Sequence, residues 1–156
     1  MEVSIQSIGM SLKVSDELLF SLYNKGKEFY PNEFGGFLIG YFEDDTHLVV
    51  TDSILPIKYK STKFNFERST EGLEKKFIDK YNEVPKKTYI GEWHTHPEAI
   101  PNFSEIDLNN WKKISKDTNN NNYYHIIVGY EAIRIWVMES KEYSTELIDT
   151  IFWKEM

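Results

Sequence analysis

The feature that most constrains this chain is a group of polar side chains within residues 91–111. His94 and His96 stand one residue apart at the end of an apolar run, and Ser104 and Asp107 follow after a loop. Two imidazoles and one carboxylate form a ligand set that is typical of zinc. Three protein ligands leave the fourth coordination position open, which indicates a catalytic rather than a structural metal.

The spacing of these residues predicts how they meet. Residues two apart on a strand share a face, so His94 and His96 can both point at one ion. Ser104 and Asp107 are three residues apart at the start of an expected helix, and therefore lie on the same side of it. The loop then folds the helix N-terminus over the histidines, where the positive end of the helix dipole favours an anion.

A hydrolytic metal site also needs a carboxylate that takes a proton from water and delivers it to the leaving nitrogen. Glu33 is the candidate, because it precedes two glycines and an apolar strand that should lie beside residues 88–94. Glu92 is the rival, since it alternates onto the face of His94. We rank Glu92 lower because it is too close in the chain to reach past the metal.

Each of these residues also has a simpler structural interpretation. Ser-x-x-Asp is a capping-box pattern, so Ser104 and Asp107 can serve only to begin a helix. A His-x-His pair also occurs without a metal, and Glu33 can be an ordinary loop carboxylate. These explanations would all have to hold together, whereas one metal site accounts for the whole pattern.

Four further aromatic side chains are expected to be structural. His47 and His125 have no partners at a suggestive spacing, and we predict that they are structural or surface residues. Trp93 and Trp111 are predicted to lie in the core rather than to bind substrate.

Composition excludes several classes of protein. The chain has 156 residues, enough for one domain over residues 1–156, and it contains no cysteine, which excludes thiolate metal sites and cysteine nucleophiles. A formal net charge of -7 argues against a nucleic-acid partner, which would need a basic face. No stretch is apolar enough to span a membrane, and the N-terminus lacks a signal-peptide pattern. We therefore expect a cytoplasmic protein, with no prediction of its oligomeric state.

Hydrophobic periodicity predicts three helices among about six strands, which is an α/β or α+β layered domain. Helices are expected after the possible caps Ser15, Ser69 and Ser104, the first two ending at Pro31 and Pro85. Residues 5–14 are expected to form a strand or an extended lead-in, and residues 58–67 an extended segment that could cover the cleft as a flap. The six strands are expected over residues 37–43, 47–55, 88–94, 123–128, 132–138 and 145–153.

The pattern of Glu33, His94-Thr-His96-Pro and Ser104-x-x-Asp107 resembles the JAMM motif of the JAB/MPN metalloprotease family. The string Glu-Phe-Gly-Gly-Phe-Leu-Ile-Gly from Glu33, the Gly-Glu-Trp-His before the ligands and a proline in the loop match as well. The resemblance extends from the first helix to the last strands, with all five functional positions filled.

This resemblance implies a curved mixed β-sheet between helices, similar to that of cytidine deaminases. It implies one zinc ion held by His94, His96 and Asp107, with water as the fourth ligand. Glu33 would be the general base and later the acid, and Ser104 would stabilise the oxyanion of the tetrahedral intermediate.

The resemblance also implies an activity. Many members of the family cut the peptide or isopeptide bond after the C-terminal glycine of ubiquitin or a ubiquitin-like protein. The short chain is most similar to the prokaryotic branch, some of whose members reverse conjugation in antiviral cyclase operons. A glycine-rich tail would bind as an added strand at a sheet edge beside the metal.

Two alternatives stay open at the level of sequence. One is a non-catalytic binding or scaffold module of the same fold, although such modules usually lack the ligands that this chain keeps. The other is a zinc hydrolase of another substrate class, such as a small amide. Nucleobase deaminases with cysteine ligands are excluded, because the chain has no cysteine.

Overall fold

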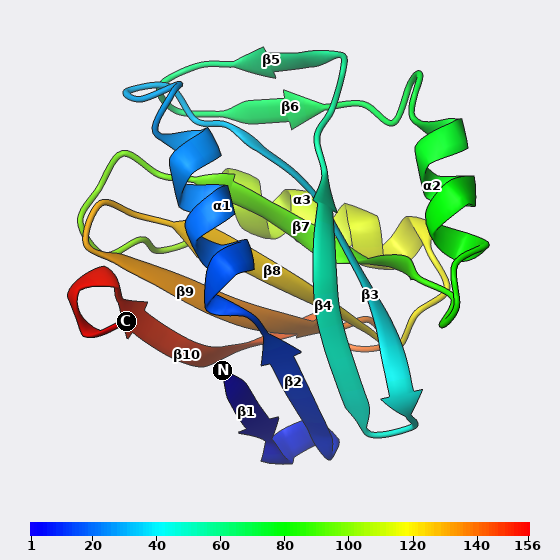
Figure 1. Cartoon of the computed structure of the whole chain (residues 1–156). Coiled ribbons are helices and arrows are strands. Elements are labelled where there is room, and N and C mark those ends of the chain that lie inside the picture. Colours follow the sequence, from blue (N-terminus) through cyan, green and yellow to red (C-terminus); the bar gives the residue numbers. More distant parts are fainter.

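A curved eight-stranded sheet organises the chain, in a computed structural model that describes all 156 residues (Figure 1). The strands lie in the order β1-β2-β4-β3-β7-β8-β9-β10. The pairs β2–β4 and β7–β8 are parallel and the others antiparallel, which confirms the predicted mixed sheet. The further likeness to cytidine deaminases stays a prediction. The strands are β1 (Glu2–Ile5), β2 (Met10–Val14), β3 (Gly35–Asp44), β4 (His47–Ile54), β7 (Thr88–Thr95), β8 (Asn122–Val128), β9 (Ala132–Glu139) and β10 (Ser144–Phe152).

The two edges of this sheet approach one another, so that the sheet is nearly closed. Ser7, in a 3-10 turn between β1 and β2, donates a hydrogen bond to the Glu146 carboxylate of β10. The strand or extended lead-in predicted over residues 5–14 is confirmed for Met10–Val14, which form β2, and is wrong for Gln6–Ile8, which form a 3-10 turn. At this turn the chain reverses direction, so β1 (Glu2–Ile5), which was not predicted, pairs antiparallel with β2.

Helix α1 (Asp16–Gly26) covers one face of the sheet and begins at the predicted cap. The Ser15 hydroxyl accepts a hydrogen bond from Leu18 N at 3.1 Å, and Leu19 and Leu22 face the core. The prediction that this helix continues to Pro31 is wrong. Beyond Gly26 the backbone tightens into bonds spanning three residues, as in a 3-10 helix, and the helix ends.

Helix α2 (Glu74–Tyr81) begins later than its predicted cap at Ser69. The Ser69 hydroxyl accepts from Glu71 N at 3.0 Å, a local turn that competes with the helix. Gly72 then adopts a φ of 82°, in the left-handed region, and the helix can form only after it.

Helix α3 (Glu105–Asp117) covers the opposite face of the sheet from α1 (Figure 1). A separate hairpin of β5 (Tyr59–Ser61) and β6 (Phe66–Arg68) accounts for the segment predicted as extended. Three helices and a mixed sheet thus make an α+β architecture. The helices of this structure are too short and too polar for any of them to cross a bilayer.

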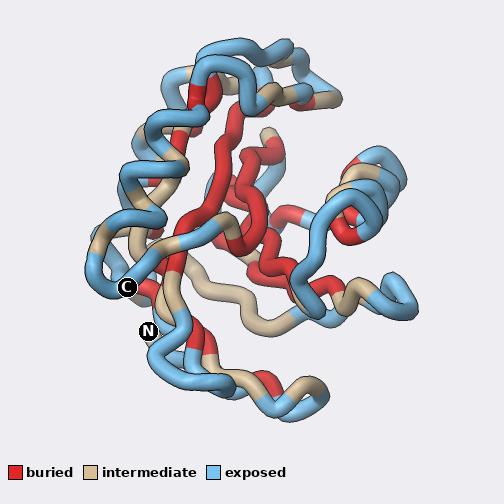
Figure 2. The backbone as a smooth tube through the Cα atoms, turned by 90° about the vertical axis from the view of Figure 1, so that its right-hand side faces the viewer, coloured by how far each residue is buried: buried red, intermediate tan, exposed pale blue.

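Buried residues follow the central strands (Figure 2). Their side chains form separate apolar clusters, the largest with α1 and a smaller one around Trp111 of α3. Trp93 is fully buried on the α1 side and donates its ring N–H to the Ser53 hydroxyl at 2.7 Å. Trp111 is buried on the α3 side and packs against Trp136. The prediction that Trp93 and Trp111 are core residues is therefore confirmed.

The close pairing of β3 and β7 yields a stability prediction. Gly35 lies opposite His94, and a methyl group on its Cα would stand 2.0 Å from the Trp93 carbonyl oxygen. The strands would have to separate, so Gly35→Ala should lower the free energy of unfolding by at least about 1–3 kcal/mol. Thermal unfolding followed by circular dichroism measures the change, and parent-like stability of the variant would contradict this close approach.

Candidate metal centre

Four buried polar side chains meet beside the N-terminus of α3. Glu33, His94, His96 and Asp107 each offer one ligand atom, and these atoms all lie within 4.8 Å of one another. The pairing of Gly35 with His94 brings the start of β3 alongside the end of β7. The structure thus brings together four of the five residues predicted from the sequence, with the fifth at the adjacent helix cap.

The distances within this group suit a small divalent ion. Nε2 of His94 lies 3.0 Å from Nε2 of His96 and 3.1 Å from Oδ1 of Asp107. Nε2 of His96 lies 2.9 Å from Oδ2 of Asp107. Tetrahedral ligands around zinc are about 3.3 Å apart, given bonds of about 2.0–2.1 Å. The three donors therefore fit a metal ion with only small adjustments.

Asp107 is aimed at the histidines by the cap of α3. The Ser104 hydroxyl accepts from Asp107 N at 3.1 Å, and Oδ2 of Asp107 accepts from Ser104 N at 2.9 Å. This is the capping box that the sequence predicted as the simpler interpretation, and it is confirmed. Because the Ser104 hydroxyl acts as an acceptor in the cap, its own hydrogen is free to be donated. Capping is therefore compatible with a second role at the site.

Glu33 stands next to the three possible ligands. Its Oε2 lies 3.9 Å from Nε2 of His96, and its side chain is buried. Burial raises the pKa of Glu33 to about 7, and the nearby Asp107 charge acts in the same direction, while His96 opposes it. A carboxyl group with a pKa near neutrality is suited to accepting and returning a proton.

The pKa shifts of His96 and Asp107 indicate that a positive charge is favoured in this group. Burial raises the pKa of Asp107, but His94 and His96 outweigh it and hold the pKa well below its usual range. Burial lowers the pKa of His94, so its ring favours the neutral form that binds metals. Burial also lowers the pKa of His96, but the bond and charge of Asp107 outweigh this and raise it to about 9. A metal ion would supply the positive charge that otherwise comes from a proton.

Glu98 belongs to the site and was missed in the sequence. Its Oε1 lies 3.2 Å from Nδ1 of His96 and accepts from Asn102 N at 2.8 Å. A carboxylate at Nδ1 fixes the ring so that Nε2 faces the metal. The signal that could have revealed it is an acidic residue two positions after the second histidine.

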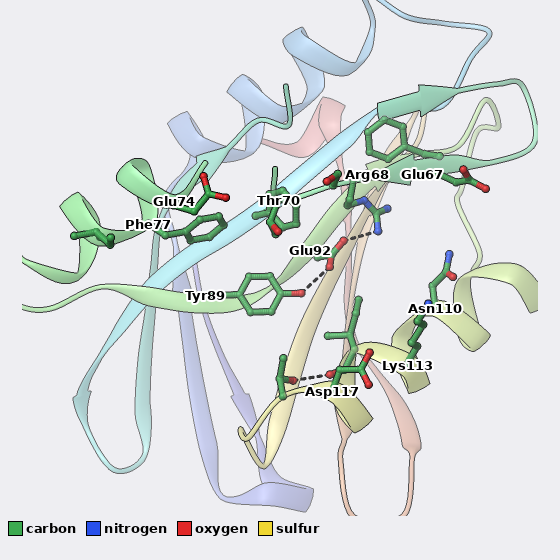
Figure 3. A pocket seen from close by; sticks show the side chains of 16 residues that line it. Glu67, Arg68, Thr70, Glu74, Phe77, Tyr89, Glu92, Asn110, Lys113 and Asp117 are labelled. Atoms are coloured by element: carbon green, nitrogen blue, oxygen red, sulfur yellow. Dashed lines mark hydrogen bonds and ion pairs between the residues drawn. The ribbon is translucent and has the colours of Figure 1, made fainter. Parts of the chain in front are cut away.

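Glu92, the rival candidate for the base, is committed elsewhere. It accepts a hydrogen bond from the Tyr89 hydroxyl at 2.6 Å and is ion-paired with Arg68 (Figure 3). It is not among the four side chains that converge. The geometry therefore favours Glu33 as the carboxylate beside the histidines.

The other two histidines lie outside the group. His47 is exposed at the β3–β4 turn and contacts Asp44 at 2.8 Å. His125 is buried and its ring stacks on Trp111, with centroids 4.4 Å apart. Both positions agree with the expectation of structural or surface residues.

A cleft of about 970 Å³ lies along β7, and none of the four converging side chains lines it. Figure 3 shows Glu92 with Tyr89 and Arg68 directed at it inside this cleft. Glu92 precedes His94 by two residues on β7, and the cleft also follows α3, which carries Asp107 nearer its start. The cleft thus lies between the β5–β6 hairpin, α2 and the part of α3 from Asn110 onward.

The fold and the site define a JAB/MPN-type domain. The family model for prokaryotic homologs of the JAB domain matches residues 15–140, and the chain belongs to this family. An archaeal JAB1/MPN domain protein from Archaeoglobus fulgidus superposes with a TM-score of 0.52 at 20% identity, over 88% of this chain and 94% of that one. A protein from Desulfitobacterium hafniense superposes with a TM-score of 0.59 at 13% identity, over 88% and 90%.

Two bacterial relatives are named CD-NTase/cGAS isopeptidase. The relative from Pseudomonas aeruginosa (strain BWHPSA011 / Pa011) is 32% identical over 106 residues, which cover 66% of this chain and 66% of the relative. The relative from Escherichia coli (strain TW11681) is 32% identical over 118 residues, which cover 70% and 71%. The match spans about two thirds of each relative's length.

The ligand assignment predicts how metal binding responds to substitution. Asp107→Ala removes one of the three donors, and we expect Zn²⁺ affinity to fall by more than the roughly 10–100-fold that outer-shell changes cost. Competition with a chromophoric chelator measures the affinity. His47→Ala, which removes an exposed imidazole, is the control and should bind Zn²⁺ like the parent. Equal affinity of Asp107→Ala and the parent would contradict the site.

Glu98 yields a finer prediction. Glu98→Ala frees the His96 ring to rotate, and we expect a loss of Zn²⁺ affinity of about tenfold, at the lower end for an outer-shell partner because Glu98 is half-exposed. Glu98→Gln keeps an oxygen acceptor and should bind Zn²⁺ more tightly than Glu98→Ala. The same chelator competition separates the variants, and no difference between them would remove Glu98 from the site.

Proposed function

We propose that this chain is a zinc-dependent isopeptidase or peptidase, acting at the C-terminus of a ubiquitin-like protein or of a protein conjugated through its C-terminus. The observation that carries the proposal is the convergence of Glu33 with His94, His96 and Asp107 in one buried group. The names of the relatives support isopeptide bonds as the target. We treat residues 1–156 as one JAB/MPN domain that holds the whole site.

Zinc is the metal that these donors favour. Magnesium and calcium prefer shells of oxygen atoms, whereas two imidazoles with one carboxylate suit zinc. His94, His96 and Asp107 would hold the ion and leave its fourth position to water. When bound, zinc lowers the pKa of water to about 7 and polarises a carbonyl group.

Glu33 and Ser104 perform the proton transfer and the charge stabilisation in this proposal. The Glu33 carboxylate accepts a proton from the attacking water and later donates it to the leaving nitrogen. Its pKa of about 7 allows both steps at neutral pH. The Ser104 hydroxyl donates a hydrogen bond to the carbonyl oxygen as negative charge develops there. The positive end of the α3 dipole favours the same charge.

The cleft is suited to an extended C-terminal tail. Strand β6 has a partner on only one side, β5, so a tail can add to it as a further strand. Acidic side chains outnumber basic ones in the cleft, which favours a tail with basic residues. The carboxylates are Glu67, Glu74, Glu92 and Asp117, and the cations are Arg68 and Lys113.

The relatives' names supply the class of conjugated protein. They support a CD-NTase or cGAS-like enzyme as the protein that is released from its conjugate. In that setting the chain would reverse conjugation in an antiviral system in the cytoplasm. A nucleic-acid partner is not part of the proposal, because the net charge is -7.

Glu33→Gln tests the catalytic assignment. The amide cannot accept the proton, so cleavage should fall by about 10²–10⁴-fold, while the three metal ligands are unchanged. The substrates are a ubiquitin-like protein and a CD-NTase, each joined through its C-terminus to a lysine of a carrier protein. Release of the carrier is followed by gel electrophoresis, and bound zinc by elemental analysis.

The controls in this experiment separate the alternatives. Chelation should abolish cleavage by the parent and added Zn²⁺ should restore it. Parent-like cleavage by Glu33→Gln would show that another group is the base. A zinc-loaded parent that cleaves neither conjugate but hydrolyses a small amide would favour a hydrolase of another class, and binding without any cleavage would favour a scaffold module.

A further inference from the structure

The backbone of Glu33 is held by the β5–β6 hairpin. Glu33 precedes β3, and in the β3–β7 ladder the first paired residue is Gly35. Glu33 N donates to the Thr62 carbonyl oxygen at 2.8 Å, and the Ser61 hydroxyl donates to the Glu33 carbonyl oxygen. A buried backbone needs both partners, and here both come from the hairpin.

Aromatic packing joins the hairpin to the residue that follows. The Phe34 ring contacts the rings of Tyr59 and Phe66, with centroids 5.2 Å and 5.3 Å apart. On its other side, Phe34 stacks on Phe29 at 3.9 Å. The turn around Glu33 therefore cannot rotate without disturbing the hairpin.

A second contact, an ion pair, joins the other end of the hairpin to the main sheet. Arg68 of β6 is ion-paired with Glu92 of β7, and both side chains are nearly buried. Strand β7 carries the ligand His94, so the hairpin connects the Glu33 backbone to the strand of the metal centre. The hairpin therefore supports the Glu33 backbone in addition to the direct hydrogen bonds between Phe34 and Thr95 of β7.

We propose that Ser61 is a positioning residue for the Glu33 carboxylate, acting through its hydrogen bond to the Glu33 carbonyl oxygen. This inference rests on the proposed role of Glu33 as the base. A carboxylate that takes a proton must be held within a fraction of an ångström. The Glu33 N–H is bonded to the main chain of the hairpin, whereas the Glu33 carbonyl oxygen accepts its hydrogen bond from the Ser61 side chain. The Phe34 N–H of the same peptide is bonded to the Thr95 hydroxyl at 3.0 Å and stays bonded when Ser61 is changed. Loss of the Ser61 bond leaves the Glu33 carbonyl oxygen without its donor, so the peptide tilts and shifts the carboxylate from its reacting position.

Ser61→Ala and Ser61→Thr test this role. Ser61→Ala should lower kcat by about ten- to a hundredfold, as expected for a displacement of about 1 Å, with KM and Zn²⁺ affinity unchanged. Ser61→Thr keeps the hydroxyl and should restore kcat. The substrate is the lysine-linked CD-NTase conjugate described above.

Ser21→Ala is the matched control. Ser21 donates its hydroxyl to the Leu18 carbonyl oxygen at 2.7 Å, but lies exposed on α1, on the other face of the sheet. Removal of this bond should leave kcat and Zn²⁺ affinity unchanged. Melting temperatures of the Ser61→Ala and Ser21→Ala variants should be similar.

Amide hydrogen exchange provides a readout that needs no substrate. The Glu33 amide should exchange faster in Ser61→Ala than in the parent, Ser61→Thr or Ser21→Ala, because local opening becomes easier. Unchanged exchange together with parent-like kcat would overturn the proposal. A parallel loss of melting temperature, Zn²⁺ affinity and kcat would also overturn it, because Ser61 would then be only structural.

Failure of the proposed function has a different signature. If Glu33 is not the base, both Glu33→Gln and Ser61→Ala will cleave like the parent although Glu33 exchange is faster in Ser61→Ala. If Ser61 does not position Glu33, Glu33→Gln will be defective and Ser61→Ala will cleave like the parent.

Discussion

The site depends on the contact between β3 and β7. These strands approach so closely that only glycine fits at Gly35, opposite His94. The contact places Glu33 just before β3, beside a histidine pair that is distant in sequence. The cap of α3 completes the arrangement by turning Asp107 toward the same point. The four side chains of the candidate metal centre are thus positioned by rigid elements, as a site that performs chemistry requires.

Hydrogen-bond partners, rather than burial, separate the two buried carboxylates in this centre. Asp107 accepts hydrogen bonds from both histidines and from the helix cap, so it stays ionised. Glu33 lacks such partners at short distance, and burial raises its pKa toward neutrality. One carboxylate is therefore suited to hold a cation and the other to exchange a proton, although both are buried side by side.

Local patterns in the sequence predicted much of the fold. Alternating apolar runs located the main strands, and side-chain caps located the starts of α1 and α3 at Ser15 and Ser104. The start of α2 was mispredicted, because a local turn at Ser69 and a left-handed Gly72 interrupt the helical pattern. The hairpin was predicted only as an extended segment, since its short strands carry a weak periodic signal.

The sequence by itself determined the donor set, because His94, His96 and Asp107 lie within one strand, loop and helix start whose spacing sets their faces. The sequence also predicted Glu33 as the carboxylate that transfers the proton, with Glu92 as a lower-ranked rival. Only the tertiary structure separated these two, since it depends on which strands pair and on which cation neutralises Glu92. The contact of Glu98 with His96 and the contact of the β5–β6 hairpin with Glu33 are also formed only in the tertiary structure. Such contacts join segments that are distant in sequence or lie in irregular loops, where no periodic pattern specifies a partner.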